Sequence, residues 1–249
     1  MKDHKNRLIE DLLRLGLSGG DHLLVHASLN AVGRFRDRAG ILVAALTEVL
    51  GSSGTLLMPC LSYKTVTQDH PDFDVSATPS CVGGLAEYFR TCEGVDRSLH
   101  PTHSVSARGR LSVFFLAEHW KDSTPCGTHS PFARLPEVQG KVMFLGCGSR
   151  PNTSMHAIEE KVIPPYLFGS RVRYQLRLKD GSRMQKIYLA HGFKNYEQRY
   201  DRLLSLMDPG ACRRGKVLDA DTLVLDSREM WAKGFRQLKE NPFFFVDQM

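Results

Sequence analysis

The sequence predicts an α/β protein in which helices pack on a sheet with much parallel pairing. Two observations lead to this fold class. Short apolar runs alternate with amphipathic segments along the first half of the chain, which is typical of strands covered by helices. In the second half, an Asp-Gly pair at 180–181 separates two strand-like segments, and this pair favours the positive φ angles of a hairpin turn.

The first half of the chain alternates helices and strands. Apolar residues recur at helical spacing in several segments, two of which end at Gly16 and Gly51. The apolar runs between them are too short for helices and are predicted as buried strands. A polar stretch at 62–78 is predicted as a loop that lines a site. The expected helices span residues 6–17, 41–50, 82–90 and 111–119, and the strands span 22–27 and 55–59.

The second half contains a strand, a glycine turn and a helix start in direct succession. Residues 142–145 are apolar and lead into Gly146-Cys147-Gly148, after which a helix is expected. The hairpin strands are predicted at 172–178 and 184–190. The remaining expected elements are a helix at 196–207, paired short strands within 216–225, and a last helix that Ser227 caps and that ends near Lys239.

Length and composition favour one globular domain spanning residues 1–249. Of the 249 residues, 42% are apolar and 24% charged, as in ordinary globular proteins. The charged first residues do not resemble a signal peptide, and no apolar run approaches the ~20 residues of a membrane span, so we expect a cytoplasmic protein without a membrane partner. Six cysteines without a C-x-x-C pair favour reduced thiols over disulfides or a zinc site.

The net charge of +6 raises the question of an anionic partner. The densest basic run is Arg34, Arg36 and Arg38, and the other basic residues are dispersed. The basic runs are not interleaved with aromatic residues in the manner of a single-strand binding platform, and no recognition-helix motif accompanies them, so nucleic-acid binding is not expected. An anionic small molecule or cofactor fits this charge better.

His156 and Glu159 are candidates for proton transfer. Positions three apart share a helix face, so Glu159 can orient the His156 imidazole and stabilise its cation while the ring acts as a base. Glu160, one residue further, is equally reachable on a helix. The alternative is a solvated ion pair without a catalytic role.

His100 and His103 suggest a metal site at first sight. However, Pro101 excludes an ordinary helix interior between them, and no third ligand is spaced to match. We therefore expect no metal and interpret both histidines as structural or as lining a substrate site.

Four separated segments resemble one family, the aminoglycoside 3-N-acetyltransferases, also called antibiotic N-acetyltransferases. Each segment is short, but they occur in the family's order and together span most of the chain. The segments are Leu24-Val25-His26-Ala27-Ser28-Leu29, His100-Pro101-Thr102-His103-Ser104, Ser130-Pro131-Phe132-Ala133-Arg134-Leu135 and Asn152-Thr153-Ser154-Met155-His156-Ala157-Ile158-Glu159.

The resemblance implies a three-layer αβα sandwich with a mixed central sheet and a small antiparallel ribbon. It also implies direct transfer of an acetyl group from acetyl-coenzyme A to a primary amine of an amino sugar. The family's His-Glu pair matches His156 as general base and Glu159 as its orienting partner. Thr153, at the helix start, either helps to stabilise the oxyanion or caps the helix.

The resemblance further implies where coenzyme A binds, in loops that follow the strands. Arg34 is a candidate to pair with the nucleotide phosphates, although a solvated basic loop is the alternative. The expected partners are coenzyme A and a small-molecule amine, and the resemblance leaves a homodimer open. The residues expected to contact coenzyme A are Ser28, Leu29, Arg34, Ser104, Ser130 and Phe132.

One departure from the family concerns the acceptor. In aminoglycoside-modifying members, acidic residues in the ribbon after the catalytic helix hold the polycationic drug, whereas residues 188–193 here contain no acidic residue. Ammonium groups need acidic partners, so antibiotic resistance is a doubtful native role, and a neutral or anionic amino sugar in glycan or natural-product biosynthesis fits better.

Two other function classes compete with the transferase. A thioesterase or amide hydrolase would use Cys126 or Cys147 as nucleophile and would require an exposed, activated thiolate. A non-catalytic homologue that retains the fold would bind a ligand without turning it over.

Overall fold

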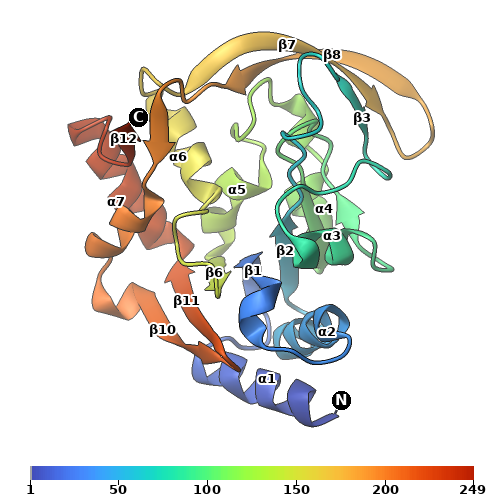
Figure 1. Cartoon of the computed structure of the whole chain (residues 1–249), viewed down its shortest axis with the longest axis vertical. Helices are drawn as coiled ribbons and strands as arrows, with labels where there is room; N and C mark the ends of the chain where they lie inside the picture. The colour runs from blue at the N-terminus through green and yellow to red at the C-terminus, as the bar shows by residue number, and fades with distance from the viewer. Residues whose placement is uncertain (1) are drawn as a thin grey trace.

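The computed structural model describes residues 2–249 and contains a mixed seven-stranded central sheet (Figure 1). Strands β6 (Lys141–Leu145), β1 (His22–Ala27) and β2 (Thr55–Pro59) lie side by side and run parallel. The strands outside these three pair antiparallel. The predicted mixed sheet is confirmed, with parallel pairing confined to its centre. The outer strands are β10 (Cys212–Val217) and β11 (Ala220–Asp226) at one edge and β5 (Val105–Gly109) and β4 (Asp96–Arg97) at the other.

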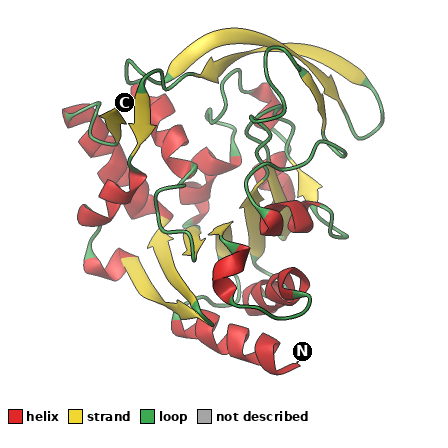
Figure 2. Ribbon diagram, viewed as in Figure 1, coloured by secondary structure: helices red, strands yellow, loops and turns green. Residues whose placement is uncertain are grey.

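Helices cover both faces of this sheet, as Figure 2 shows in red and yellow. Neighbouring residues of a strand point to opposite faces, so Leu23 and Val25 enter one hydrophobic core and Leu24 enters the other. The first core is closed by α1 (Lys2–Arg14), α2 (Arg38–Leu50) and α3 (Gly84–Arg90). The second is closed by α4 (Ser112–Leu116), α5 (Pro131–Arg134), α6 (Ser154–Val162) and α7 (Ser227–Glu240).

A long antiparallel ribbon arches over one end of the molecule (Figure 1). It consists of β7 (Phe168–Arg177) and β8 (Arg183–His191), joined by the predicted turn at Asp180-Gly181. A third strand, β3 (Asp72–Asp74), pairs parallel to β7 and lies inside the segment predicted as a loop. This small sheet has a hydrophobic cluster separate from the two main cores, and the cluster includes the buried side chains of Phe73, Val172 and Tyr188.

Two predictions near the C-terminus are wrong. Residues 196–207 are not an α-helix: β9 (Tyr196–Gln198) pairs with β12 (Val246–Gln248), and a 3₁₀ helix follows at Tyr200–Ser205. The apparent helical spacing arises because Tyr200 and Leu203 are both buried on that short turn. The cap of α7 is Asp226, whose side chain accepts a hydrogen bond from the Glu229 N–H, and not Ser227.

The remaining regular elements are short 3₁₀ helices in the connections. They span Leu29–Val32, His119–Lys121, Leu135–Val138 and Pro209–Ala211. Within residues 2–249, no helix has both the length and the apolar character that crossing a membrane requires.

Candidate active site

A cavity of about 660 Å³ lies between the carboxyl ends of the central strands and the β7–β8 ribbon. The last residues of β1 and β2 form part of its wall, and the ribbon contributes Val172, Tyr174 and His191. Ligands of α/β proteins commonly bind at the carboxyl ends of the parallel strands. The cavity is therefore the candidate active site.

The turn after β6 directs helix α6 toward this cavity. Gly146 has φ of +66°, and a Cβ there would lie 2.2 Å from the Cβ of Ala31, so only glycine fits. The Asn152 side chain then accepts a hydrogen bond from the Ser154 N–H (3.2 Å) at the helix start. As a result, His156 lies on the first turns of α6 and lines the cavity.

The His156 ring is held by Glu159 and not by Glu160. Its Nδ1 lies 3.2 Å from Glu159 Oε2 and 2.9 Å from the Tyr200 hydroxyl. Because Tyr200 donates its proton to Glu159 (2.7 Å), the proton on the imidazole is assigned to Nδ1. Nε2 of His156 therefore carries the lone pair that a general base needs.

Two tyrosines fix the Glu159 carboxylate, which is completely buried. Tyr200 donates to Oε2 and Tyr166 donates to Oε1 (2.8 Å). Burial, reinforced by the nearby Glu159 charge, raises the pKa of both phenols well above the usual range, so both remain hydrogen-bond donors. Residue spacing does not identify Tyr166 or Tyr200, because both lie outside α6 and reach Glu159 only through tertiary contacts.

A second histidine–glutamate pair lies beside the first. His191 Nε2 is 2.8 Å from Glu160 Oε1, and Glu160 also accepts hydrogen bonds from the Thr124 hydroxyl (2.5 Å) and the Cys126 N–H (2.7 Å). Burial raises the pKa of Glu160 to about 7, and it lowers the pKa of His191 well below the usual value. The neutral ring of His191 therefore lies 2.8 Å from a carboxyl group that is partly protonated near pH 7.

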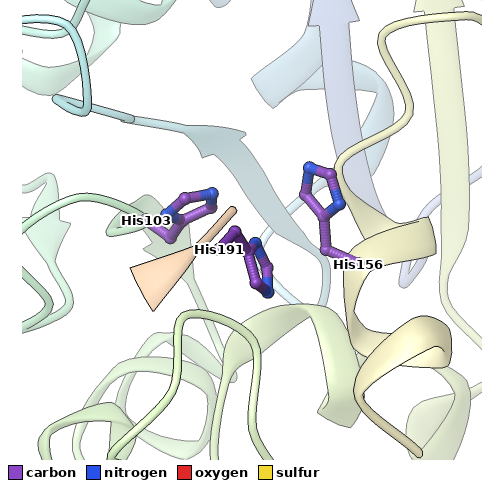
Figure 3. Close-up of side chains that lie close together, drawn as sticks. All are labelled: His103, His156 and His191. Carbon is purple, nitrogen blue, oxygen red and sulfur yellow. The ribbon is translucent and has the colours of Figure 1, made fainter. Parts of the chain in front are cut away.

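His103 completes a group of three histidines at the cavity (Figure 3). Its ring centroid lies 5.8 Å from that of His156 and 5.2 Å from that of His191. Burial, and then the neighbouring histidines, lower the pKa of His103. His100, by contrast, has a structural role, because its Nδ1 accepts hydrogen bonds from the backbone N–H groups of Thr102 and His103.

Thr153 does not act as the side-chain cap of α6. It occupies the N-cap position, but its side chain makes no capping hydrogen bond, and the residue lines the cavity. Instead, the Asn152 side chain accepts the hydrogen bond from the Ser154 N–H at the start of α6. The Thr153 hydroxyl therefore remains available to a group bound in the cavity.

The residues expected to contact coenzyme A are not among those that line the cavity. Ser28 follows β1 directly, Leu29 begins the first 3₁₀ helix, and Arg34 is exposed. Ser104 is buried, donates to the Cys60 carbonyl (2.7 Å) and accepts from Arg97. Ser130 caps α5, and Phe132 is buried in the second core. A role of these six residues in cofactor binding rests on the resemblance alone.

Neither cysteine proposed as a nucleophile is activated. Burial raises the pKa of Cys147 to about 11, and burial together with nearby carboxylates raises that of Cys126 well above its usual value. Reactive cysteines require the opposite shift, because the thiolate is the nucleophile. These environments disfavour a cysteine-dependent hydrolase.

Curated relatives match nearly the whole chain. Aminoglycoside N(3)-acetyltransferase IV of Salmonella sp is 32% identical over 97% of this chain and 90% of its own. Aminoglycoside N(3)-acetyltransferase VII of Streptomyces paromomycinus is 30% identical over 95% and 91% of the two chains. The predicted class of enzyme, an N-acetyltransferase, is confirmed.

Solved structures agree with this assignment. The apoenzyme of aminoglycoside acetyltransferase AAC(3)-IVa superposes with a TM-score of 0.80 at 29% identity, covering 97% of this chain and 90% of its own. AAC-IIIb, solved as a binary complex with CoASH, superposes with a TM-score of 0.81 at 26% identity, covering 95% and 96%. The family model described as aminoglycoside 3-N-acetyltransferase matches residues 24–239. The chain therefore belongs to the aminoglycoside 3-N-acetyltransferase family.

Proposed function

We propose that this chain transfers the acetyl group of acetyl-coenzyme A directly to a primary amine, with His156 as general base. The observation that carries the proposal is the hydrogen-bonded group of His156, Glu159 and Tyr200 at the cavity wall. A base within a cavity, oriented by a buried carboxylate, has the arrangement that general-base catalysis requires.

The proposed step balances without a covalent enzyme intermediate. The amine nitrogen attacks the thioester carbonyl, and His156 Nε2 removes the proton that the nitrogen loses as the C–N bond forms. The C–S bond then breaks and coenzyme A leaves as a thiolate, which takes up a proton. Glu159 stabilises the imidazolium that forms on His156, and Thr153, which lines the cavity, donates a hydrogen bond from its hydroxyl to the oxyanion in this proposal.

Acetyl-coenzyme A is the proposed donor because the chain shares its fold with AAC-IIIb, whose structure contains CoASH. The net charge of +6 also favours a polyanionic ligand. Arg34 and the loop residues Ser28 and Leu29 remain predictions as contacts of this cofactor.

We propose further that the acceptor is an amino sugar with few ammonium groups. The residues that line the cavity in the described part of the chain include no Asp or Glu. Arg150, the one Lys or Arg among them, pairs with Glu197 (2.5 Å). An acceptor with several ammonium groups would bury charges without partners, whereas a neutral or anionic amino sugar would not.

The test measures free thiol released from acetyl-coenzyme A with different amines. The panel contains sisomicin, glucosamine and a nucleotide-linked amino sugar, each with wild type and with His156→Ala. We expect release that depends on the acceptor, is strongest with glucosamine or the nucleotide-linked amino sugar and is lost in the variant. Release without an acceptor would indicate a thioester hydrolase instead of a transferase. A preference for sisomicin would refute the argument that the cavity disfavours acceptors with several ammonium groups.

A further inference from the structure

Three of the histidines that line the cavity come from distant parts of the chain. His103 precedes β5, His156 lies on α6 and His191 ends β8. One ring nitrogen from each lies within 4.8 Å of the other two (Figure 3). Imidazole is the commonest protein ligand of Zn²⁺ and of related transition-metal ions, with Zn–N distances of about 2.0–2.1 Å. Small rotations of the rings would bring the three nitrogens onto one ion.

Each of these rings is oriented through one of its two nitrogens. His103 Nδ1 lies 2.9 Å from the Thr102 hydroxyl, His156 Nδ1 lies 2.9 Å from the Tyr200 hydroxyl, and His191 Nε2 lies 2.8 Å from Glu160. Metal-binding histidines in proteins typically have such partners on the nitrogen away from the metal. The arrangement leaves one nitrogen on every ring for a ligand.

The remaining nitrogen of His191 supports a ligand independently. Nδ1 of His191 is buried and has no hydrogen-bond partner among the residues that the structure describes. A buried polar atom without a partner costs about 1–3 kcal/mol, and such atoms are uncommon in native proteins. When His191 Nε2 donates its proton to Glu160, Nδ1 carries a lone pair, which a metal ion would satisfy and apolar packing of the rings would not.

We propose that His103, His156 and His191 form a binding site for a divalent transition-metal ion of the zinc type. Three protein ligands leave a further coordination position open toward the cavity. A bound ion would take the lone pair that His156 uses as a base, so metal binding and acetyl transfer exclude each other. This second consequence rests on the proposed function, but the binding of the ion does not.

The test is a titration of chelator-treated protein with CoCl₂, followed by visible absorption, and with ZnCl₂, followed by calorimetry. We expect one ion per chain and the intense absorption of four- or five-coordinate Co²⁺, which Zn²⁺ abolishes by displacement. His103→Ala and His191→Ala should each weaken binding by about 100-fold or more, since even loss of an outer-sphere partner costs about 10–100-fold. The control is His70→Ala, which removes an exposed histidine that does not line the cavity.

A conservative variant is also needed, because loss of metal binding in an alanine variant can also result from misfolding. Glu160→Gln keeps all three ligands and removes the carboxyl group that orients His191, so it should weaken Co²⁺ binding by about 10-fold. Wild-type affinity in all three site variants, or a spectrum of six-coordinate Co²⁺ only, would overturn the proposal. The Co²⁺ titration needs no substrate, so a failure to find any acetyl acceptor would leave its outcome unaffected.

Discussion

Two histidine–glutamate pairs meet at the cavity, and both carboxylates belong to helix α6. Glu159 accepts hydrogen bonds from two tyrosines and also contacts His156. Glu160 accepts hydrogen bonds from the Thr124 hydroxyl and the Cys126 N–H and lies 2.8 Å from His191 Nε2. Burial raises the pKa of Glu160 to about 7 and lowers that of His191. In the second pair, a proton taken up near neutral pH therefore resides on the carboxyl group and not on the ring.

The comparison teaches that residue type alone does not assign a proton-transfer role. Both pairs combine the same two side chains at hydrogen-bond distance. The first pair has a ring that is 14% exposed at the cavity and a carboxylate fixed by phenols, which suits a base that must hold a proton briefly. The second has a ring and a carboxyl group that are each only 5% exposed, which suits a structural or ligand-binding role.

The largest effect expected from this difference is on turnover. His156→Ala should lower kcat by about 10³-fold, because a general base contributes about 10²–10⁴-fold. His191→Ala should lower kcat by about tenfold or less, since in our proposal it accepts no proton from the amine. Steady-state kinetics of both variants in buffer containing a chelator test this. Equal losses in the two variants would remove the distinction between the pairs.

The next effect concerns stability as a function of pH. The pKa of Glu160 is about 7 in the folded protein and about 4.5 in the unfolded chain. The unfolded chain therefore loses its proton first as the pH rises, and the stability that Glu160 contributes below pH 4.5 is lost between about pH 4.5 and 7. At about 1.36 kcal/mol per pKa unit, the loss approaches about 3 kcal/mol.

Glu160→Gln isolates this contribution, because the glutamine is neutral at every pH and the buried histidines titrate in both proteins. The free energy of unfolding of wild type, measured with urea, should fall relative to that of the variant as the pH rises through this window. A constant difference between the two proteins would mean that Glu160 is ionised throughout.

The sequence predicted the parts of this molecule that depend on local patterns. Strands 22–27 and 55–59 have the predicted bounds, because short apolar runs between glycine-rich turns leave little freedom of assignment. The contact between His156 and Glu159 was predicted because the two residues lie three positions apart on one helix. Spacing could not choose between Glu159 and Glu160, since this depends on which face of α6 meets Tyr200.

The parts that were missed depend on contacts between distant segments. Tyr200 was assigned to a helix, and its role follows only from the tertiary contact between its 3₁₀ turn and α6. The expectation of no metal rested on residue spacing around His100 and His103. In the fold, His103 lies beside His156 and His191. Residue spacing within a single segment cannot predict this proximity.

The smallest effect distinguishes the two tyrosines of the first pair. Tyr200→Phe removes a hydrogen bond to both Glu159 and His156, and a hydrogen bond to a charged group contributes about 1.5–3 kcal/mol. We expect kcat to fall by about tenfold, because the imidazole loses part of its orientation.

Tyr166→Phe is the matched control, because the Tyr166 hydroxyl contacts Glu159 Oε1 and makes no hydrogen bond to His156. That variant should lose comparable stability in urea denaturation but retain more than half of kcat. If both variants lost the same activity, the tyrosines would act only by donating hydrogen bonds to the buried Glu159 carboxylate. The orientation of His156 by Tyr200 would then have no part in catalysis.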